Sequence, residues 1–297
     1  MLFPVAGIEV HPLVPPAVAF IISFFTSMSG LSGAFLLLPF QMSVLGYTPP
    51  SVSATNQLFN IIAIPSGVLR YMREGRMVWP LTWAVVAGTL PGVLIGAIIR
   101  VTYLPNTADF KLFVGGVLLY IGGRLLKSIL TARHCKANLE AAPQLLGQTK
   151  TLEFSLKRIS YSFQNETYSA STLGIFFLTF VVGIVGGIYG IGGGAIIAPF
   201  FITFFGLPVY TVAGACLMGT FVTSIAGVGI YQLLAFIYPT QVIAPDYLLG
   251  ILFGVGGVGG MYLGALCQKY VPATTLKILL TIFILFTAGK YTLGYFF

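Results

Sequence analysis

The chain has 297 residues, of which 57% are hydrophobic and 7% are charged. A water-soluble domain carries about 25% charged residues, so most of this chain's surface must face lipid. The formal net charge of +8 does not indicate nucleic-acid binding, because the basic residues cluster in a few short loops, as the orientation signals of membrane proteins do. The composition predicts an integral membrane protein whose partner is the lipid bilayer, and it argues against nucleic acid as a partner.

Neither the cysteines nor the acidic residues form a recognisable chemical site. The three cysteines, Cys135, Cys216 and Cys267, share no close spacing, which argues against a zinc site or a disulfide framework. No acidic residue lies in the middle of a long apolar run, so a buried carboxylate proton relay has no support. A nucleophile–base pair is also missing. We therefore expect no metal, no cofactor and no enzymatic activity.

An N-terminal tail, residues 1–14, precedes the first apolar stretch. A membrane helix needs about 20 apolar residues, and the stretch at 15–47 is interrupted at 27–33. Its two pieces are either two short spans or a re-entrant pair of half-helices. Three longer candidate spans follow, at about 51–71, 78–101 and 108–130. Together these segments are predicted to form a first transmembrane repeat, residues 15–130.

Residues 131–170 are the one long polar segment, and we predict that they form a cytoplasmic linker. Leu152, Phe154 and Leu156 alternate there with polar residues, which indicates a short strand. The second half, residues 171–297, follows the plan of the first. An interrupted apolar stretch at 171–206 precedes three candidate spans, at about 209–236, 243–267 and 273–294. The chain is therefore predicted to hold a second transmembrane repeat after the linker.

Each interruption contains glycines, and the two interruptions match at a fixed offset. The second is Gly190-Ile191-Gly192-Gly193-Gly194, followed by Pro199. A shift of 160 residues aligns it with a weaker copy in the first half, which holds Gly30, Gly33 and Pro39 but has Ser32 and Ala34 in place of two glycines. Each glycine costs a helix about 1 kcal/mol relative to alanine. Both positions are therefore predicted to be helix breaks.

Loop charges predict that the two repeats are inverted. The loop 70–76 carries three arginines, and basic loops stay cytoplasmic. Its counterpart at 237–241 has no charge, which suits the outside, while the counterpart of the loop 102–107 carries Lys269. The predicted fold is an all-α polytopic membrane protein with two inverted repeats, each a broken helix pair plus three transmembrane helices. Secondary transporters use this plan.

A helix that restarts after a break is suited to bind an anion. A helix restarting near Gly194 would point free N–H groups and a positive dipole end at the break, which makes an anion site without a buried cation. The alternative is that the glycines only permit tight helix crossing. The predicted substrate contacts in the breaks are Gly30, Gly33, Gly190, Gly192, Gly193 and Gly194, and the predicted structural residues are Pro39 and Pro199.

Neutral polar residues begin the long helix that follows each break. In the first half they are Ser51, Ser53, Thr55, Asn56, Gln57 and Asn60. In the second half they include Thr211, Cys216 and Thr220, with Thr223 and Ser224 beyond. Such groups suit an oxyanion that must bind and then leave, and amides are costly in apolar surroundings. We predict substrate contacts at Thr55, Asn56, Asn60, Cys216 and Thr220; the alternative is interhelical hydrogen bonding.

The two glycine motifs, each followed by its proline, resemble the signature of the TauE/SafE family of sulfite exporters. The resemblance implies a multi-pass permease of the prokaryotic inner membrane for small sulfur-containing or organic anions, with export of sulfite or an organosulfonate as the leading function. Thiosulfate-uptake relatives rely on pore cysteines, and of the three cysteines here Cys216 is the one near the proposed path. Two alternative functions stay open: a passive anion channel of the same fold, and a non-transporting membrane subunit of a sulfur redox complex. Whether the chain forms a homo-oligomer also stays open.

Overall fold

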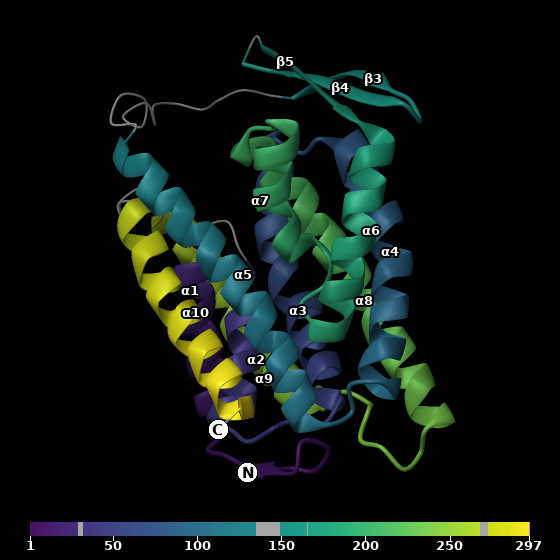
Figure 1. Cartoon of the computed structure of the whole chain (residues 1–297), viewed down its shortest axis with the longest axis vertical. Coiled ribbons are helices and arrows are strands. Elements are labelled where there is room, and N and C mark those ends of the chain that lie inside the picture. Colours follow the sequence, from purple (N-terminus) through teal and green to yellow (C-terminus); the bar gives the residue numbers. More distant parts are fainter. Residues whose placement is uncertain (29–31, 135–148, 165, 268–272, 297) are drawn as a thin grey trace.

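The computed structural model describes residues 1–28, 32–134, 149–164, 166–267 and 273–296. Within these ranges the chain forms ten α-helices, a two-stranded hairpin and a three-stranded sheet. Most of the helices run along the long axis of the molecule (Figure 1). The N and C termini lie at one end of this bundle and the three-stranded sheet lies at the other (Figure 1).

Five helices form the first half, close to the predicted boundaries. They are α1 (Val14–Met28), α2 (Ala34–Ser43), α3 (Ser51–Arg73), α4 (Trp79–Thr102) and α5 (Thr107–His134). Prolines suit the starts of two of them. Pro50 is the N-cap residue of α3, and Pro80 lies in the first turn of α4, where the missing N–H costs no intrahelical hydrogen bond.

The second half also has five helices, again with two shorter helices before three longer ones. They are α6 (Thr172–Tyr189), α7 (Gly194–Phe205), α8 (Val209–Ile237), α9 (Tyr247–Cys267) and α10 (Ala273–Phe296). α6 ends at Gly190, whose φ of 83° is left-handed, a conformation that glycine adopts at helix ends without strain. The helix predicted to restart near Gly194 begins at that residue.

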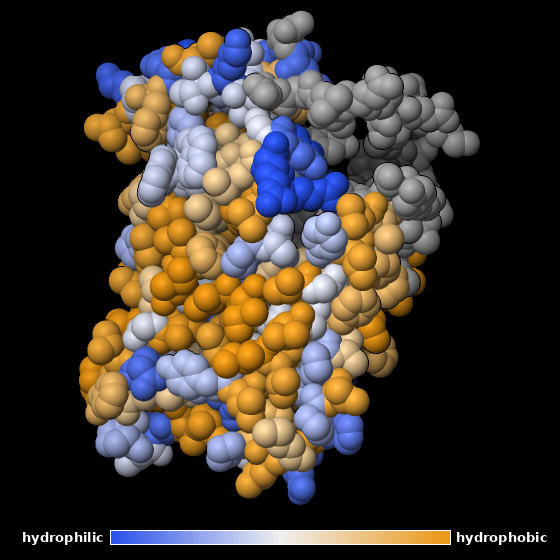
Figure 2. Space-filling view, turned by 180° about the vertical axis from the view of Figure 1, so that it is seen from behind, coloured by the Kyte–Doolittle hydropathy of each residue, from blue (hydrophilic) through white to orange (hydrophobic). Residues whose placement is uncertain are grey.

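The described part of the chain contains four helices that are long and apolar enough to cross a membrane. They comprise α4, α6, Thr211–Ile237 of α8 and Tyr247–Gly264 of α9. Many large apolar side chains on these helices and their neighbours are exposed; Phe177, for example, is 70% exposed and Ile282 is 65% exposed. Figure 2 shows a broad apolar band across the middle of one face, with hydrophilic side chains gathered towards both ends. Such a surface suits lipid contact around the middle of the bundle.

Helices pack mainly across the two halves rather than within each half. α4 packs along α6 and α1 packs along α9, while α3 contacts α8 and α9, α4 contacts α8, and α5 pairs with α10. Glycines permit the close approaches. A Cβ atom on Gly92 of α4 would meet the Phe180 carbonyl oxygen of α6, and one on Gly260 of α9 would meet the Phe20 carbonyl oxygen of α1. The absence of side chains at these positions lets the backbones approach closely.

The linker contains an antiparallel sheet in the order β3-β4-β5. Its strands are β3 (Lys150–Phe154), β4 (Arg158–Phe163) and β5 (Glu166–Ser171). The sequence predicted one strand near residues 152–156; the strand there begins earlier. β4 and β5 were missed, although Ile159, Tyr161 and Phe163 alternate with polar residues along β4. The Thr149 N–H donates to the Gly75 carbonyl at 3.1 Å, so the arginine-bearing loop and the start of the sheet lie at the same end of the bundle.

Tyr161 joins this sheet to the helices and carries a testable pH dependence. Its hydroxyl lies 2.7 Å from Thr211 Oγ1 at the start of α8, and burial raises the pKa of Tyr161 to about 12. Unfolded tyrosine ionises near pH 10. Only the unfolded chain loses this proton between about pH 10 and 12, so the contribution of Tyr161 to the free energy of unfolding falls as pH rises through that window.

We expect Tyr161→Phe to lower the free energy of unfolding by about 1 kcal/mol at pH 8, the typical value of one hydrogen bond. The variant should also lose part of the destabilisation that wild type shows between pH 8 and pH 11. Thermal unfolding of both proteins at the two pH values measures this difference. Equal pH dependence in the two proteins would contradict the account.

The predicted N-terminal tail is a folded hairpin of β1 (Leu2–Phe3) and β2 (Ile8–Glu9). It is held by Asp246, whose carboxylate accepts hydrogen bonds from the Ala6 N–H at 3.1 Å and the Leu249 N–H at 3.0 Å. The second bond caps the start of α9. Asp246 is 2% exposed, so the chain does bury one carboxylate, at a helix end rather than within an apolar run.

Candidate substrate site at the two helix breaks

Asn56 of α3 connects the two broken helix pairs. Its Nδ2 donates to the Ala34 carbonyl at the start of α2 and to the Gly190 carbonyl at the end of α6, both at 3.0 Å. Its Oδ1 accepts a hydrogen bond from Gln41 Nε2 at 3.3 Å. The side chain of Asn56 is completely buried. Both N–H groups of the Asn56 amide therefore donate to backbone carbonyls, one in each broken helix pair.

Asn60 repeats this arrangement one helical turn later. Its Nδ2 donates to the Ile191 carbonyl at 2.9 Å, and its Oδ1 accepts from Ser32 Oγ at 2.8 Å. The i, i+4 spacing places Asn56 and Asn60 on one face of α3. We call these two asparagines, together with their four backbone and side-chain partners in the breaks, the asparagine latch. The predicted alternative role, interhelical hydrogen bonding, is what both amides do in this conformation.

Every glycine of the second break has a neighbour where its Cβ atom would be. A Cβ on Gly190 would lie 2.5 Å from Ser53 Cα, and one on Gly193 would lie 2.5 Å from Thr89 Cγ2. A Cβ on Gly192 would lie 2.8 Å from Thr220 Cγ2, and one on Gly194 would meet the Cys216 carbonyl oxygen. Close packing alone thus accounts for the glycine at all four positions. Gly192, with φ of 72°, also needs the left-handed conformation.

The first break is described in part. Gly30 lies outside the described residues. Gly33 precedes α2, and a Cβ there would lie 2.9 Å from Ser23 Oγ of α1. Pro39 is buried inside α2, and its carbonyl accepts a hydrogen bond from the Tyr291 hydroxyl at 3.1 Å. Pro199 lies within α7.

Unpartnered polar atoms lie against both breaks. Among the described residues, Ser23 Oγ, Ser224 Oγ and both amide atoms of Gln57 are buried without a hydrogen-bond partner. Ser23 Oγ lies beside Gly33, and Ser224 Oγ would lie 3.0 Å from a Cβ atom on Gly192. Leaving such a group unpaired costs about 1–3 kcal/mol. One free hydroxyl therefore faces each break, next to the helix end that carries the positive dipole.

The remaining predicted residues have separate positions. Thr55 Oγ1 lies 2.9 Å from the Tyr47 hydroxyl and accepts from the Asp246 N–H at 2.9 Å, so it joins the loop before α3 to the start of α9. Thr220 Oγ1 donates to the Cys216 carbonyl within α8 at 2.9 Å. Cys216 is 5% exposed, and its carbonyl lies against the start of α7.

Sequence reasoning named Gln57 and Ser224 only as neighbours of the chosen residues, and it missed Ser23. Ser23 lies inside the apolar helix α1 before the break, where a single serine gives a weak signal. A search for isolated hydroxyl residues within apolar runs next to each glycine cluster would have found Ser23.

The apolar surface band, the long apolar helices and the two broken pairs that meet inside the bundle define a multi-pass membrane protein. Neutral polar side chains and helix ends meet where the two broken pairs approach each other. The chain belongs to the family described as sulfite exporter TauE/SafE, whose model matches residues 16–291. It is therefore a membrane transporter of this family, and membership of a transporter family implies that it is not an enzyme.

One curated relative is itself described as a transporter. The chain is similar to the probable membrane transporter protein YunE of Bacillus subtilis (strain 168). The two are 25% identical over 214 residues, which cover 68% of this chain and 71% of YunE. No solved structure matches the chain.

Proposed function

We propose that the chain is a permease of the prokaryotic inner membrane that exports sulfite or a small organosulfonate. The family model supports a small anion as the substrate. The observation that carries the proposal is the pair of buried, unpartnered hydroxyls, Ser23 and Ser224, one beside each helix break. Neutral donors beside two helix ends attract an oxyanion without the strong hold of a buried cation. Weak binding of this kind is what a transport path requires.

We propose further that the residues 15–130 and 171–297 are inverted repeats joined by a cytoplasmic linker at 131–170. If the two halves are repeats, α1–α5 correspond in order to α6–α10. The contact between α4 and α6 then corresponds to the contact between α9 and α1, and the contact between α3 and α9 corresponds to that between α8 and α4. All four pairs are in contact. In Figure 1, α7 lies towards the sheet end of the bundle and α2 towards the end with the termini. Two re-entrant pairs entering from opposite faces fit this placement.

The proposed path runs between the breaks, past the asparagine latch. The substrate contacts would be Gly30, Gly33, Asn56, Asn60, Gly190, Gly192, Gly193, Gly194, Cys216 and Thr220, joined by Ser23, Gln57 and Ser224. Thr55 supports α3 from outside the path. Because Asn56 and Asn60 bond both breaks at once, movement of one break away from α3 must open the latch. Alternate opening of the two breaks would expose the site to one side of the membrane at a time.

Ser23→Ala and Ser224→Ala test the proposed site directly. Each is expected to raise the KM for sulfite flux in proteoliposomes at least about tenfold, since a hydrogen bond to a charged group contributes about 1.5–3 kcal/mol. Neither change should lower the melting temperature, because neither hydroxyl has a partner to lose. Initial rates over a range of sulfite concentrations measure the effect.

Thr287→Val is the matched control, because the Thr287 hydroxyl donates to Phe283 within its own helix at 2.9 Å, away from the breaks. It should leave the KM unchanged. An unchanged KM in both serine variants, with flux intact, would remove the two hydroxyls from the substrate site. A flux that never saturates in wild type would instead favour the passive channel.

A further inference from the structure

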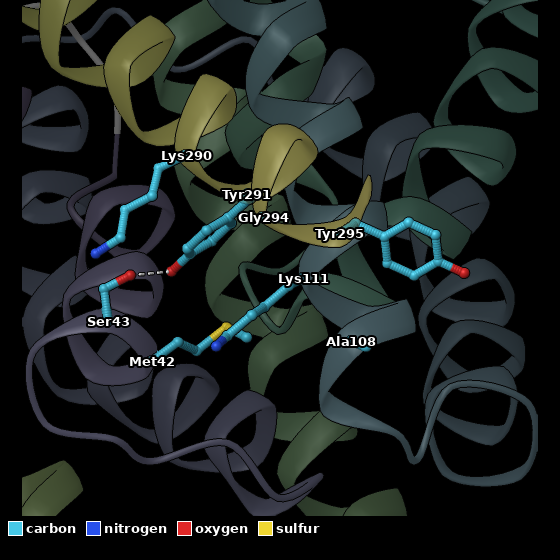
Figure 3. A pocket seen from close by; sticks show the side chains of 8 residues that line it. All are labelled: Met42, Ser43, Ala108, Lys111, Lys290, Tyr291, Gly294 and Tyr295. Atoms are coloured by element: carbon cyan, nitrogen blue, oxygen red, sulfur yellow. Dashed lines mark hydrogen bonds between the residues drawn. The ribbon is translucent and has the colours of Figure 1, made fainter. Parts of the chain in front are cut away.

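A cavity of about 220 Å³ lies between α2, α5 and α10 (Figure 3). The helix ends that line it are at the end of the bundle that carries the termini (Figure 1). Helices from both halves line it. The lining residues are Met42, Ser43, Ala108, Lys111, Lys290, Tyr291, Gly294 and Tyr295. Since a water molecule takes up about 30 Å³ in the liquid, the cavity has room for a small anion together with part of its hydration shell.

Two lysines make the cavity cationic. The side chains of Lys111 and Lys290 reach towards α2, and their amino groups end near Met42 and Ser43 (Figure 3). The ion pairs found among the described residues join Glu74 to Arg70 and Arg76. Neither Lys111 nor Lys290 takes part in these ion pairs. Asp109 lies on the same helix as Lys111, but it contacts the Tyr295 hydroxyl at 3.5 Å, and in Figure 3 this hydroxyl points away from both lysines.

A pair of hydroxyls connects this cavity to the first broken helix. Ser43 Oγ lies 2.7 Å from the Tyr291 hydroxyl, which donates to the Pro39 carbonyl at 3.1 Å. Both Ser43 and Pro39 belong to α2, which begins at the first break. The nine helical steps from Ala34 to Ser43 span about 14 Å. The cavity therefore lies at the far end of the helix whose start faces the proposed substrate site.

We propose that the lysine cavity is a second anion site, through which the transported sulfite or sulfonate passes between the first break and the surface. This inference rests on the proposed function and extends it. Two ammonium groups suit two oxygens of one trigonal or tetrahedral oxyanion. An ammonium is a strongly hydrated point charge, so it exchanges its anion for water readily. Its attraction acts at a distance and is screened by salt.

Lysine acetylation with mass spectrometry tests binding without any transport step. Purified protein in nanodiscs of neutral phosphatidylcholine is treated with an acetylating reagent, with and without methanesulfonate as the probe. Methanesulfonate should slow the acetylation of Lys111 and Lys290 at least about threefold. Lys127 lies on the same helix, about 24 Å further along by helical rise, and its rate should not change. Equal rates at Lys111 and Lys290 with and without the probe would overturn the inference.

An anionic lipid headgroup has the same chemistry, and a second arm separates it from the soluble anion. The acetylation is repeated in nanodiscs that contain phosphatidylglycerol. Protection that methanesulfonate supplies in both lipids supports the inference. Protection that appears with phosphatidylglycerol alone, and that methanesulfonate does not add to, would assign the cavity to lipid and overturn the inference.

Flux measurements link the cavity to transport. The double variant Lys111→Met/Lys290→Met should raise the KM for sulfite at least about fivefold and lose most of the salt dependence of that KM, whereas Lys127→Met should match wild type. An unchanged KM and salt dependence in the double variant would overturn the inference while leaving the permease proposal intact. Protection of the lysines in a protein that moves no anion would instead count against the permease alone.

Discussion

Gly190→Ala is expected to reduce anion flux at least about tenfold, and Gly206→Ala is expected to leave it nearly unchanged. Both glycines end a helix with a left-handed φ, 83° at Gly190 and 62° at Gly206. Alanine costs about 1–2 kcal/mol in this conformation at either position. The two variants therefore share the same backbone strain and differ in their surroundings.

The surroundings decide the expected difference. A Cβ on Gly190 would lie 2.5 Å from both Ser53 Cα and the Ser53 carbonyl oxygen, whereas nothing lies within 4 Å of a Cβ on Gly206. Since the clash is with the backbone of α3, no side-chain rotation relieves it, and the break must move away from Asn56. Each additional 1.4 kcal/mol of destabilisation lowers the population of the transport-competent conformation about tenfold.

Sulfite flux per folded protein, with the folded fraction taken from gel filtration in detergent, measures both variants. Thermal unfolding separates the shared strain from the clash. If Gly190→Ala transported as well as Gly206→Ala, the contact between the second break and α3 would have no part in transport.

Asn56→Asp is expected to reduce flux more than about tenfold near pH 7.5 and to recover part of it at lower pH. The change keeps the shape of the side chain but replaces the NH₂ donor with an oxygen. Two buried carbonyls, those of Ala34 and Gly190, then lose their donor, and each costs about 1–3 kcal/mol when unsatisfied. Protonation of the new carboxyl supplies one O–H donor, which can satisfy one of the two carbonyls.

Asn60→Asp should be milder, because its Oδ1 can still accept from Ser32 and only the bond to the Ile191 carbonyl is lost. Asn106→Asp is the control: its amide is exposed and contacts Asp109 at 3.4 Å. Initial flux between pH 5.5 and 8, normalised to wild type, gives the three profiles. Flat profiles with normal flux at Asn56→Asp would show that transport does not depend on the latch.

The helices and breaks were predictable because their signals are local. Apolar length, a proline at a helix start and a run of glycines each act within a few residues, and the predicted restart near Gly194 is where α7 begins. Asp246 illustrates the limit. The sequence showed only that it lies outside the middle of the long apolar runs, yet Asp246 is 2% exposed and its carboxylate accepts a hydrogen bond from Ala6, a residue 240 positions away.

The sequence predicted which residues lie at the candidate site better than it predicted their hydrogen-bond partners and roles. Asn56 and Asn60 stood out as amides on one face of an apolar helix, but their partners lie as far as 134 positions away, and no local pattern encodes such pairs. The glycines were interpreted as anion contacts first and packing positions second. A Cβ atom on any of the four glycines in the second break would clash with a neighbouring helix, so close packing explains all four. These clashes depend on how the helices cross, which the sequence does not show.

The most direct test of the permease proposal is counterflow of labelled sulfite into proteoliposomes that contain purified wild-type protein and a high internal concentration of unlabelled sulfite. A carrier with one exchangeable site accumulates label transiently above the external concentration, and the rate saturates with external sulfite. We predict this overshoot, and we predict that Ser224→Ala shifts its half-saturation to higher concentration. Entry of label no faster than in protein-free liposomes, for sulfite and for small organosulfonates alike, would contradict the account.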